Sequence, residues 1–171
     1  MGLRDDAIVR ALAAARAPDM RMQLSDIGGV SLLNDAYNAN PNSMRAALET
    51  VAALATTGRR VAVLGDMKEL GPSSERYHRE IGQFVAAAKA FDMLVCVGTD
   101  AGLIAEAAVA SGFAAEHVSR YDDARTASLA IPPALREGDL VLLKGSRSVH
   151  LEYVAKALTR RQDAPVRMAA S

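Results

Sequence analysis

Short, continuous runs of apolar residues alternate along the chain with longer segments in which apolar residues recur at helical spacing. The clearest runs are RRVAVLGD at 59–66, DMLVCVG at 92–98 and GDLVLLKG at 138–145. Such runs, without polar alternation, are typical of strands that helices cover on both faces. Strands that alternate with helices form a mostly parallel sheet. The sequence therefore predicts a single α/β domain with a doubly wound, Rossmann-like sheet.

The segment before the first predicted crossover helix has a different pattern. MRMQLSDIGGVSLLND (20–35) predicts a β-hairpin that turns at Gly28 and Gly29, because paired glycines suit a tight hairpin turn. Apolar spacing predicts an earlier helix from Asp5 to Ala17, which Pro18 ends. We therefore divide the chain into a leading helix and linker (1–19), one domain (20–160) and a tail without apolar period that we expect to be disordered (161–171).

Composition excludes several classes of function. Twenty basic and twenty acidic residues cancel, and aromatic residues make up only 4% of the chain, so neither a charged surface nor a stacking platform for nucleic acid is expected. One cysteine cannot form an internal disulfide, and no apolar run reaches the roughly 20 residues of a membrane span. We expect a cytoplasmic monomer without membrane insertion.

Three polar segments each follow a predicted strand and precede a predicted helix: NDAYNANPNS (34–43), GDMKELGPSS (65–74) and KGSRSVH (144–150). In parallel α/β sheets, ligands bind at the carboxyl ends of the strands, beside helix N-termini. The three loops are therefore the candidate binding loops.

The first loop has two open interpretations. Asn42 or Ser43 could simply cap the helix that begins near Met44. That leaves Asp35, Asn38 and Asn40 for a ligand, and short carboxylates and amides suit the hydroxyls and base edge of a nucleotide.

The other two loops are equally open. Asp66, Lys68 and Glu69 either face a charged ligand or form a solvated turn. Lys144 and Arg147, which flank Gly145–Ser146, form either an anion cradle or two solvated cations beside a capping serine. Neither G-x-G-x-x-G nor G-x-x-x-x-G-K-[ST] occurs.

Single candidate residues outside the loops carry less weight. The three histidines show no metal-ligand spacing, and no metal site is expected. His78 is predicted to be a surface or supporting residue, and Cys96 a small core residue.

Taken together, DAYNANPNSM, VAVLGDMKELG and LVLLKGSRS resemble, in this order and spacing, the C-terminal domain of the Mur ligase family. The resemblance runs from about Met20 to Leu158, and the YNANP and GDMKELG forms favour its D-alanyl-D-alanine-adding branch. Members of that branch join D-alanyl-D-alanine to UDP-N-acetylmuramoyl-tripeptide with ATP, through an acyl phosphate, in peptidoglycan synthesis.

The resemblance implies a role for each loop. The adenosine part of ATP would contact the first loop, at Asp35, Tyr37, Asn38, Asn40 and Pro41. Lys144 and Arg147 would act catalytically on the phosphate and acceptor side. Asp66, Lys68 and Glu69 would line the same cleft, either to meet the incoming dipeptide or to hold the closed state. Ser146 would also bind substrate.

The resemblance also implies partners. An N-terminal domain would hold the UDP-sugar, and a central domain would hold the P-loop and Mg²⁺. Neither motif set occurs in this sequence, so we expect an excised domain with an artificial start at Met1 and no activity by itself. Two alternatives stay open: a nucleotide-binding or regulatory module without catalysis, or the same domain of another Mur-type ligase.

Overall fold

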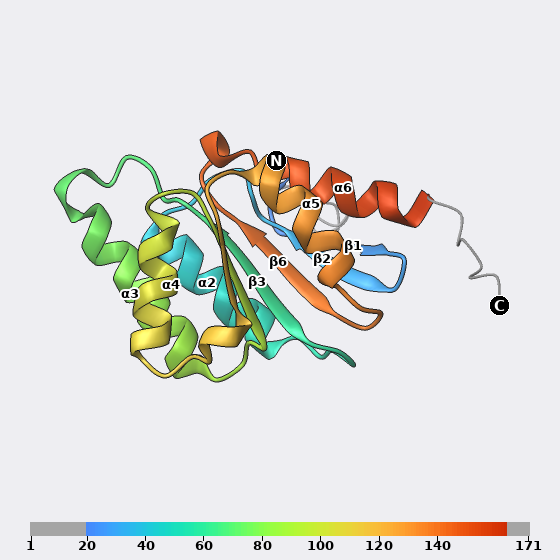
Figure 1. Cartoon of the computed structure of the whole chain (residues 1–171), viewed down its shortest axis with the longest axis horizontal. Coiled ribbons are helices and arrows are strands. Elements are labelled where there is room, and N and C mark those ends of the chain that lie inside the picture. Colours follow the sequence, from blue (N-terminus) through green and yellow to red (C-terminus); the bar gives the residue numbers. More distant parts are fainter. Residues whose placement is uncertain (1–19, 164–171) are drawn as a thin grey trace, which may run out of the picture.

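The computed structural model describes residues 20–163, which form a six-stranded sheet flanked by helices (Figure 1). The strands are β1 (Gln23–Ile27), β2 (Val30–Asn34), β3 (Arg60–Gly65), β4 (Met93–Val97), β5 (Val118–Tyr121) and β6 (Leu140–Lys144). The α-helices are α2 (Pro41–Ala53), α3 (Ser74–Ala88), α4 (Ala101–Ala110), α5 (Ala124–Ala134) and α6 (Glu152–Asp163). Short 3-10 turns lie at Gly71–Ser73, Ala115–His117 and Arg147–Val149.

The predicted hairpin is confirmed. β1 pairs antiparallel with β2, and both turn glycines adopt positive φ, 59° at Gly28 and 80° at Gly29. A side chain at Gly29 would also meet Glu137, with its Cβ 2.8 Å from that side chain's Cγ. The turn therefore needs glycine for both its backbone conformation and its neighbours.

The sheet runs in the order β1-β2-β6-β3-β4-β5, and every pair except β1–β2 is parallel. The last strand along the chain, β6, thus lies between β2 and β3. This confirms the predicted mostly parallel, doubly wound sheet. The order also brings the loops after β2, β6 and β3 side by side at the carboxyl edge.

Two apolar cores, one on each face of the sheet, account for the continuous apolar runs. One core joins the sheet to α2, α3 and α4, and the other joins it to α5 and α6 (Figure 1). Side chains alternate between the cores along each strand, so Ala62 and Leu64 of β3 lie in the first and Val61 and Val63 in the second. Since helices cover both faces, these strands have no solvent-facing side on which alternate residues would be polar.

Boundaries differ from the predictions at the chain ends. Helix α6 continues to Asp163, beyond the predicted domain end at residue 160. The helix predicted at 5–17 lies outside the described residues. Among residues 20–163, no helix is both long and apolar enough to cross a membrane.

A buried ion pair fastens β6 to β3 at the edge opposite the candidate loops. Asp139 is 1% exposed and accepts hydrogen bonds from the Arg59 backbone (3.0 Å), the Arg59 guanidinium (2.6 and 3.1 Å) and the Arg136 backbone (2.8 Å). Burial raises the pKa of Asp139, but the hydrogen bonds from Arg59 and Arg136 outweigh it and hold this pKa below the ordinary value.

We expect Asp139→Asn to lower the free energy of unfolding at pH 7 by about 3 kcal/mol, because the Arg59 guanidinium loses a buried partner. A lowered carboxyl pKa stabilises the fold fully above the unfolded value of about 3.9, and the stabilisation is lost as pH falls through the folded value. Urea denaturation should therefore show the gap to wild type closing below about pH 4. Glu116→Gln, at an exposed site, is the control; an equal loss in both variants would contradict the assignment.

Candidate functional site

The carboxyl edge of the sheet gathers five loops, those after β2, β6, β3, β4 and β5. The sequence identified the first three. The structure adds the turn Gly98–Asp100 after β4 and the pair Asp122–Asp123 before α5.

The asparagines after β2 mainly shape their own loop. Asn34 Oδ1 accepts from the Ala36 amide (3.3 Å), and Asn38 Oδ1 accepts from the Ala39 amide (2.8 Å). Asn40 caps α2: its side-chain Oδ1 accepts from the backbone amide of Ser43 (2.9 Å), and its backbone amide donates to Ser43 Oγ (3.0 Å). The cap is therefore Asn40, which the sequence analysis left for a ligand, and neither Asn42 nor Ser43, the two residues considered for capping.

The start of α2 also explains the position of Pro41. Pro41 occupies the first turn of α2, where a missing N–H costs nothing. Among the polar residues of this loop, Asn38 and Asn40 stay exposed, as does Tyr37 at 44%.

Lys144 is buried, which corrects the expectation of a cation exposed on its loop. The residue is 1% exposed and lies beneath the loop after β2. Its Nζ pairs with Asp35 Oδ2 at 2.7 Å and donates to the backbone carbonyls of Asn38 (2.7 Å) and Asp35 (3.3 Å). Because β6 lies beside β2, the lysine that ends β6 fastens the neighbouring loop.

The segment that leads into β1 packs on this loop as well. The Met22 amide donates to Asp35 Oδ1 (3.1 Å), and the Tyr37 amide donates to the Met20 carbonyl (3.1 Å). The Arg21 guanidinium lies 4.2 Å from the centre of the Tyr37 ring, a cation–π contact. Sequence reasoning missed Arg21, which no local pattern distinguishes from a surface cation.

Asp66 and Ser146 also turn inward. Asp66 is 4% exposed and accepts from the Ala101 amide at the start of α4 (2.7 Å). Ser146 is 6% exposed; its amide donates to the Asp66 carbonyl (2.9 Å), and its Oγ accepts from the Lys68 amide (2.8 Å). These hydrogen bonds join the loops after β3 and β6.

Gly98 makes room for the Asp66 carboxylate. A Cβ there would stand 2.6 Å from Asp66 Cγ, and its φ of 114° is unsuited to other residues.

Lys68 is the cation that this segment presents to solvent. Its Nζ lies 2.8 Å from Asp66 Oδ2 and 3.5 Å from Asp100 Oδ2, while its side chain is 45% exposed. The hydrogen bond to Asp66 raises the pKa of Lys68 and outweighs its partial burial. The ammonium therefore stays charged at neutral pH.

A pocket of about 310 Å³ opens beside Lys68. Its lining has polar groups from four loops and from the first turns of α5 and α6, namely Asp66, Lys68, Thr99, Asp122, Asp123, Arg125, Ser148, His150 and Tyr153. The Arg125 guanidinium donates to the Tyr153 hydroxyl at 3.0 Å and lies over its ring. The pocket thus contains two cations, Lys68 and Arg125, near several carboxylates.

The predicted site residues therefore fall into two groups. Asp66 and Lys68 line the pocket, whereas Asp35, Tyr37, Asn38, Asn40, Pro41 and Lys144 form a separate cluster after β2 and β6. Glu69 and Arg147 are exposed and lie outside the pocket lining. Arg147 Nη1 contacts Met20 Sδ at 2.7 Å.

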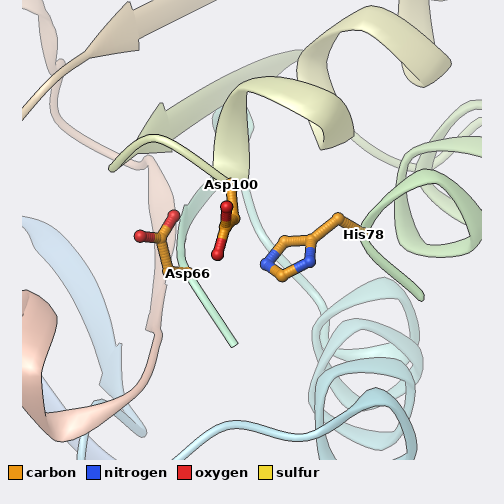
Figure 2. A group of neighbouring side chains, drawn as sticks. All are labelled: Asp66, His78 and Asp100. Atoms are coloured by element: carbon orange, nitrogen blue, oxygen red, sulfur yellow. The ribbon is translucent and has the colours of Figure 1, made fainter. Parts of the chain in front are cut away.

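His78 is fully buried in α3, at 0% exposed, so the surface alternative of its prediction is wrong and the supporting one stays open. Figure 2 shows His78 with Asp66 and Asp100, whose ligand atoms lie within 4.8 Å of one another. A metal ion does not suit this group: both imidazole nitrogens already have backbone partners, and the Lys68 ammonium pairs with both carboxylates.

Comparisons with known proteins agree with this architecture. Residues 20–147 match the family described as Mur ligase, glutamate ligase domain. A UDP-N-acetylmuramoyl-tripeptide--D-alanyl-D-alanine ligase from Bacillus subtilis is 35% identical over 158 residues, covering 92% of this chain and 34% of the relative.

Solved structures extend the likeness to three dimensions. A MurF structure from Acinetobacter baumannii matches with a TM-score of 0.79 and 28% identity, over 92% of this chain and 34% of that one. The MurF ligase from Thermotoga maritima in complex with ADP has the same fold, with a TM-score of 0.71 at 23% identity over 92% of this chain and 36% of that one.

The chain thus spans about a third of the length of the relatives that it matches. The family match covers most of the described residues, including the loops after β2 and β3 and the start of the loop after β6. The chain belongs to the Mur ligase family, through its glutamate ligase domain.

Proposed function

We propose that this domain serves an ATP-dependent ligase that adds D-alanyl-D-alanine to UDP-N-acetylmuramoyl-tripeptide in peptidoglycan synthesis. One observation carries the proposal: the relatives that match 92% of the chain at 35 and 37% identity are D-alanyl-D-alanine ligases of this kind. In this proposal the enzyme works in the cytoplasm as a monomer.

The pocket beside Lys68 suits the dipeptide. A dipeptide is a zwitterion, so its carboxylate needs cations and its amine needs an acceptor. Lys68 and Arg125 supply the cations, while Asp122 and Asp123 are exposed carboxylates in the same lining. Ser146 supports this site by accepting from the Lys68 amide, and Asp66 supports it by pairing with the Lys68 ammonium, while Glu69 follows outside the lining.

The cluster after β2 suits the nucleotide. Tyr37 offers an exposed ring, and Asn38 and Asn40 offer exposed amides, the groups that recognise a base edge or ribose hydroxyls. Asp35, Pro41 and Lys144 fix the shape of this loop. ATP would lie between this loop and a central domain that holds Mg²⁺, beside Arg147, an exposed cation that contacts Met20.

The chemistry in this proposal is acyl transfer through an acyl phosphate. The tripeptide carboxylate attacks the γ-phosphate of ATP and ADP leaves. The dipeptide amine then attacks the carbonyl carbon of the acyl phosphate, and phosphate and a proton are released as the amide forms. This domain would orient the amine and stabilise charge when it closes over the central domain.

An activity assay of the full-length ligase tests the proposal. We expect ATP hydrolysis to require both the UDP-tripeptide and D-alanyl-D-alanine, with neither diaminopimelate nor lysine replacing the dipeptide. Preference for a single amino acid as acceptor would assign the domain to another Mur-type ligase and contradict the proposal.

For the 171-residue chain alone, we expect no phosphate release from ATP and nucleotide binding no tighter than about 1 mM, because half of a split site supplies few phosphate contacts. Calorimetry and a phosphate assay measure both quantities. Micromolar ATP binding would show that the chain has a complete nucleotide site and would contradict this expectation.

A further inference from the structure

We propose that His78 is a positioning residue: its neutral imidazole fixes the Asp66–Lys68 backbone and so sets where the Lys68 ammonium points. The contact itself is present in this structure. Its catalytic consequence rests on the proposed function.

The hydrogen bonds of His78 define its tautomer. Nδ1 lies 2.7 Å from the Ser74 backbone carbonyl, which only accepts, so Nδ1 carries the proton. The Met67 amide lies 3.0 Å from Nε2 and only donates, so Nε2 is the acceptor. His78 is therefore neutral and protonated on Nδ1.

The Met67 hydrogen bond is the central one of three consecutive attachments. The Asp66 carbonyl accepts from the Ser146 amide (2.9 Å), the Met67 amide donates to His78, and the Lys68 amide donates to Ser146 Oγ (2.8 Å). The Met67 side chain is itself 0% exposed. Helix α3 and the loop after β6 thus hold the segment from two sides.

The segment turns sharply directly after Lys68. Glu69 has a φ of 66°, in the left-handed region. The backbone before this turn therefore decides whether the Lys68 ammonium reaches Asp66, Asp100 and the pocket.

A charged imidazole cannot accept the hydrogen bond from the Met67 amide. Protonation would place an Nε2–H against the Met67 N–H, two donors facing each other. The titratable and charged groups nearby are Asp66, Asp100 and Lys68, on the loop after β3 and the turn before α4. The Lys68 ammonium already pairs with both carboxylates, so the imidazole can remain a neutral hydrogen-bond acceptor.

Three substitutions separate positioning from packing. In His78→Gln the side-chain oxygen reaches about as far as Nε2 and can still accept from Met67. In His78→Asn the amide reaches only as far as Nδ1, so the Ser74 contact survives and the Met67 contact is lost. His78→Leu removes both.

The first measurement is amide hydrogen exchange on the chain itself. We expect exchange at Met67 and Lys68 to be roughly tenfold faster in His78→Asn and His78→Leu, and close to wild type in His78→Gln. The amide of Val95, in the middle of the sheet, is the reference. Equal rates in the Gln and Asn variants, or equal acceleration at Val95, would overturn the proposal.

Two further readouts complete the test. Nitrogen NMR of wild type at pH 7 should show the tautomer protonated on Nδ1; an Nε2–H form would overturn the proposal. In the full-length ligase, His78→Asn should raise KM for D-alanyl-D-alanine about tenfold with kcat little changed, and His78→Gln should restore it. If exchange responds as expected and KM does not, the positioning contact stands and the proposed dipeptide site fails.

Discussion

Replacing Lys144 by methionine is expected to lower the free energy of unfolding by about 3 kcal/mol, because it leaves the Asp35 carboxylate without its buried cation. The lysine side chain is 2% exposed and that of Asp35 is 15% exposed, so water screens the pair only weakly. The substitution also removes the donor to the Asn38 and Asp35 carbonyls. Urea denaturation of the chain measures the loss.

A double variant separates the charge from the packing. Asp35→Asn in the Lys144→Met background removes the stranded charge, so it should recover at least about 1 kcal/mol. Lys156→Met, at an exposed position on α6, is the matched control and should change stability by less than about 0.5 kcal/mol. If Lys144→Met unfolds like wild type but the full-length ligase loses turnover, Lys144 acts on a ligand and the structural role is wrong.

Lys68→Met is expected to have the opposite signature in the full-length ligase. Because Lys68 is itself 45% exposed and the Asp66 carboxylate keeps the hydrogen bond from the Ala101 amide, the free energy of unfolding should fall by no more than about 1 kcal/mol. Loss of one of the two cations in the pocket should lower kcat/KM for D-alanyl-D-alanine about 100-fold and leave KM for ATP unchanged.

Steady-state kinetics with each substrate varied in turn measure this difference, and thermal melts check the fold. Lys156→Met again serves as the control, since its charge lies outside this pocket. A rise in KM for ATP with unchanged dipeptide kinetics would place Lys68 at the nucleotide and would refute the division of the edge into two sites.

Local sequence patterns predicted most of the fold. Continuous apolar runs gave β3, β4 and β6, and the glycine pair gave the hairpin, because both signals depend on residues close in the chain. The strand order did not follow from such signals. That β6 lies between β2 and β3 depends on pairing between residues about 80 to 110 positions apart.

The same limit explains the errors at the site. Lys144, Ser146 and Asp66 were identified as polar loop residues, but whether they face solvent depends on the neighbouring loops. The same holds for His78, because its position in a predicted helix does not show that its imidazole lies beneath the loop after β3. Thr99 and Arg125 could not be assigned to the pocket from the sequence, because they reach it only through the places of β4 and β5 in the sheet.

The most direct test of the account is to map D-alanyl-D-alanine on this chain by amide chemical shifts, at dipeptide concentrations up to about 10 mM. We expect perturbations at Lys68, Thr99 and Arg125, around the pocket, and their loss in Lys68→Met. Perturbations centred on Asn38 and Asn40, or an unchanged response in Lys68→Met, would contradict the assignment of this pocket to the dipeptide.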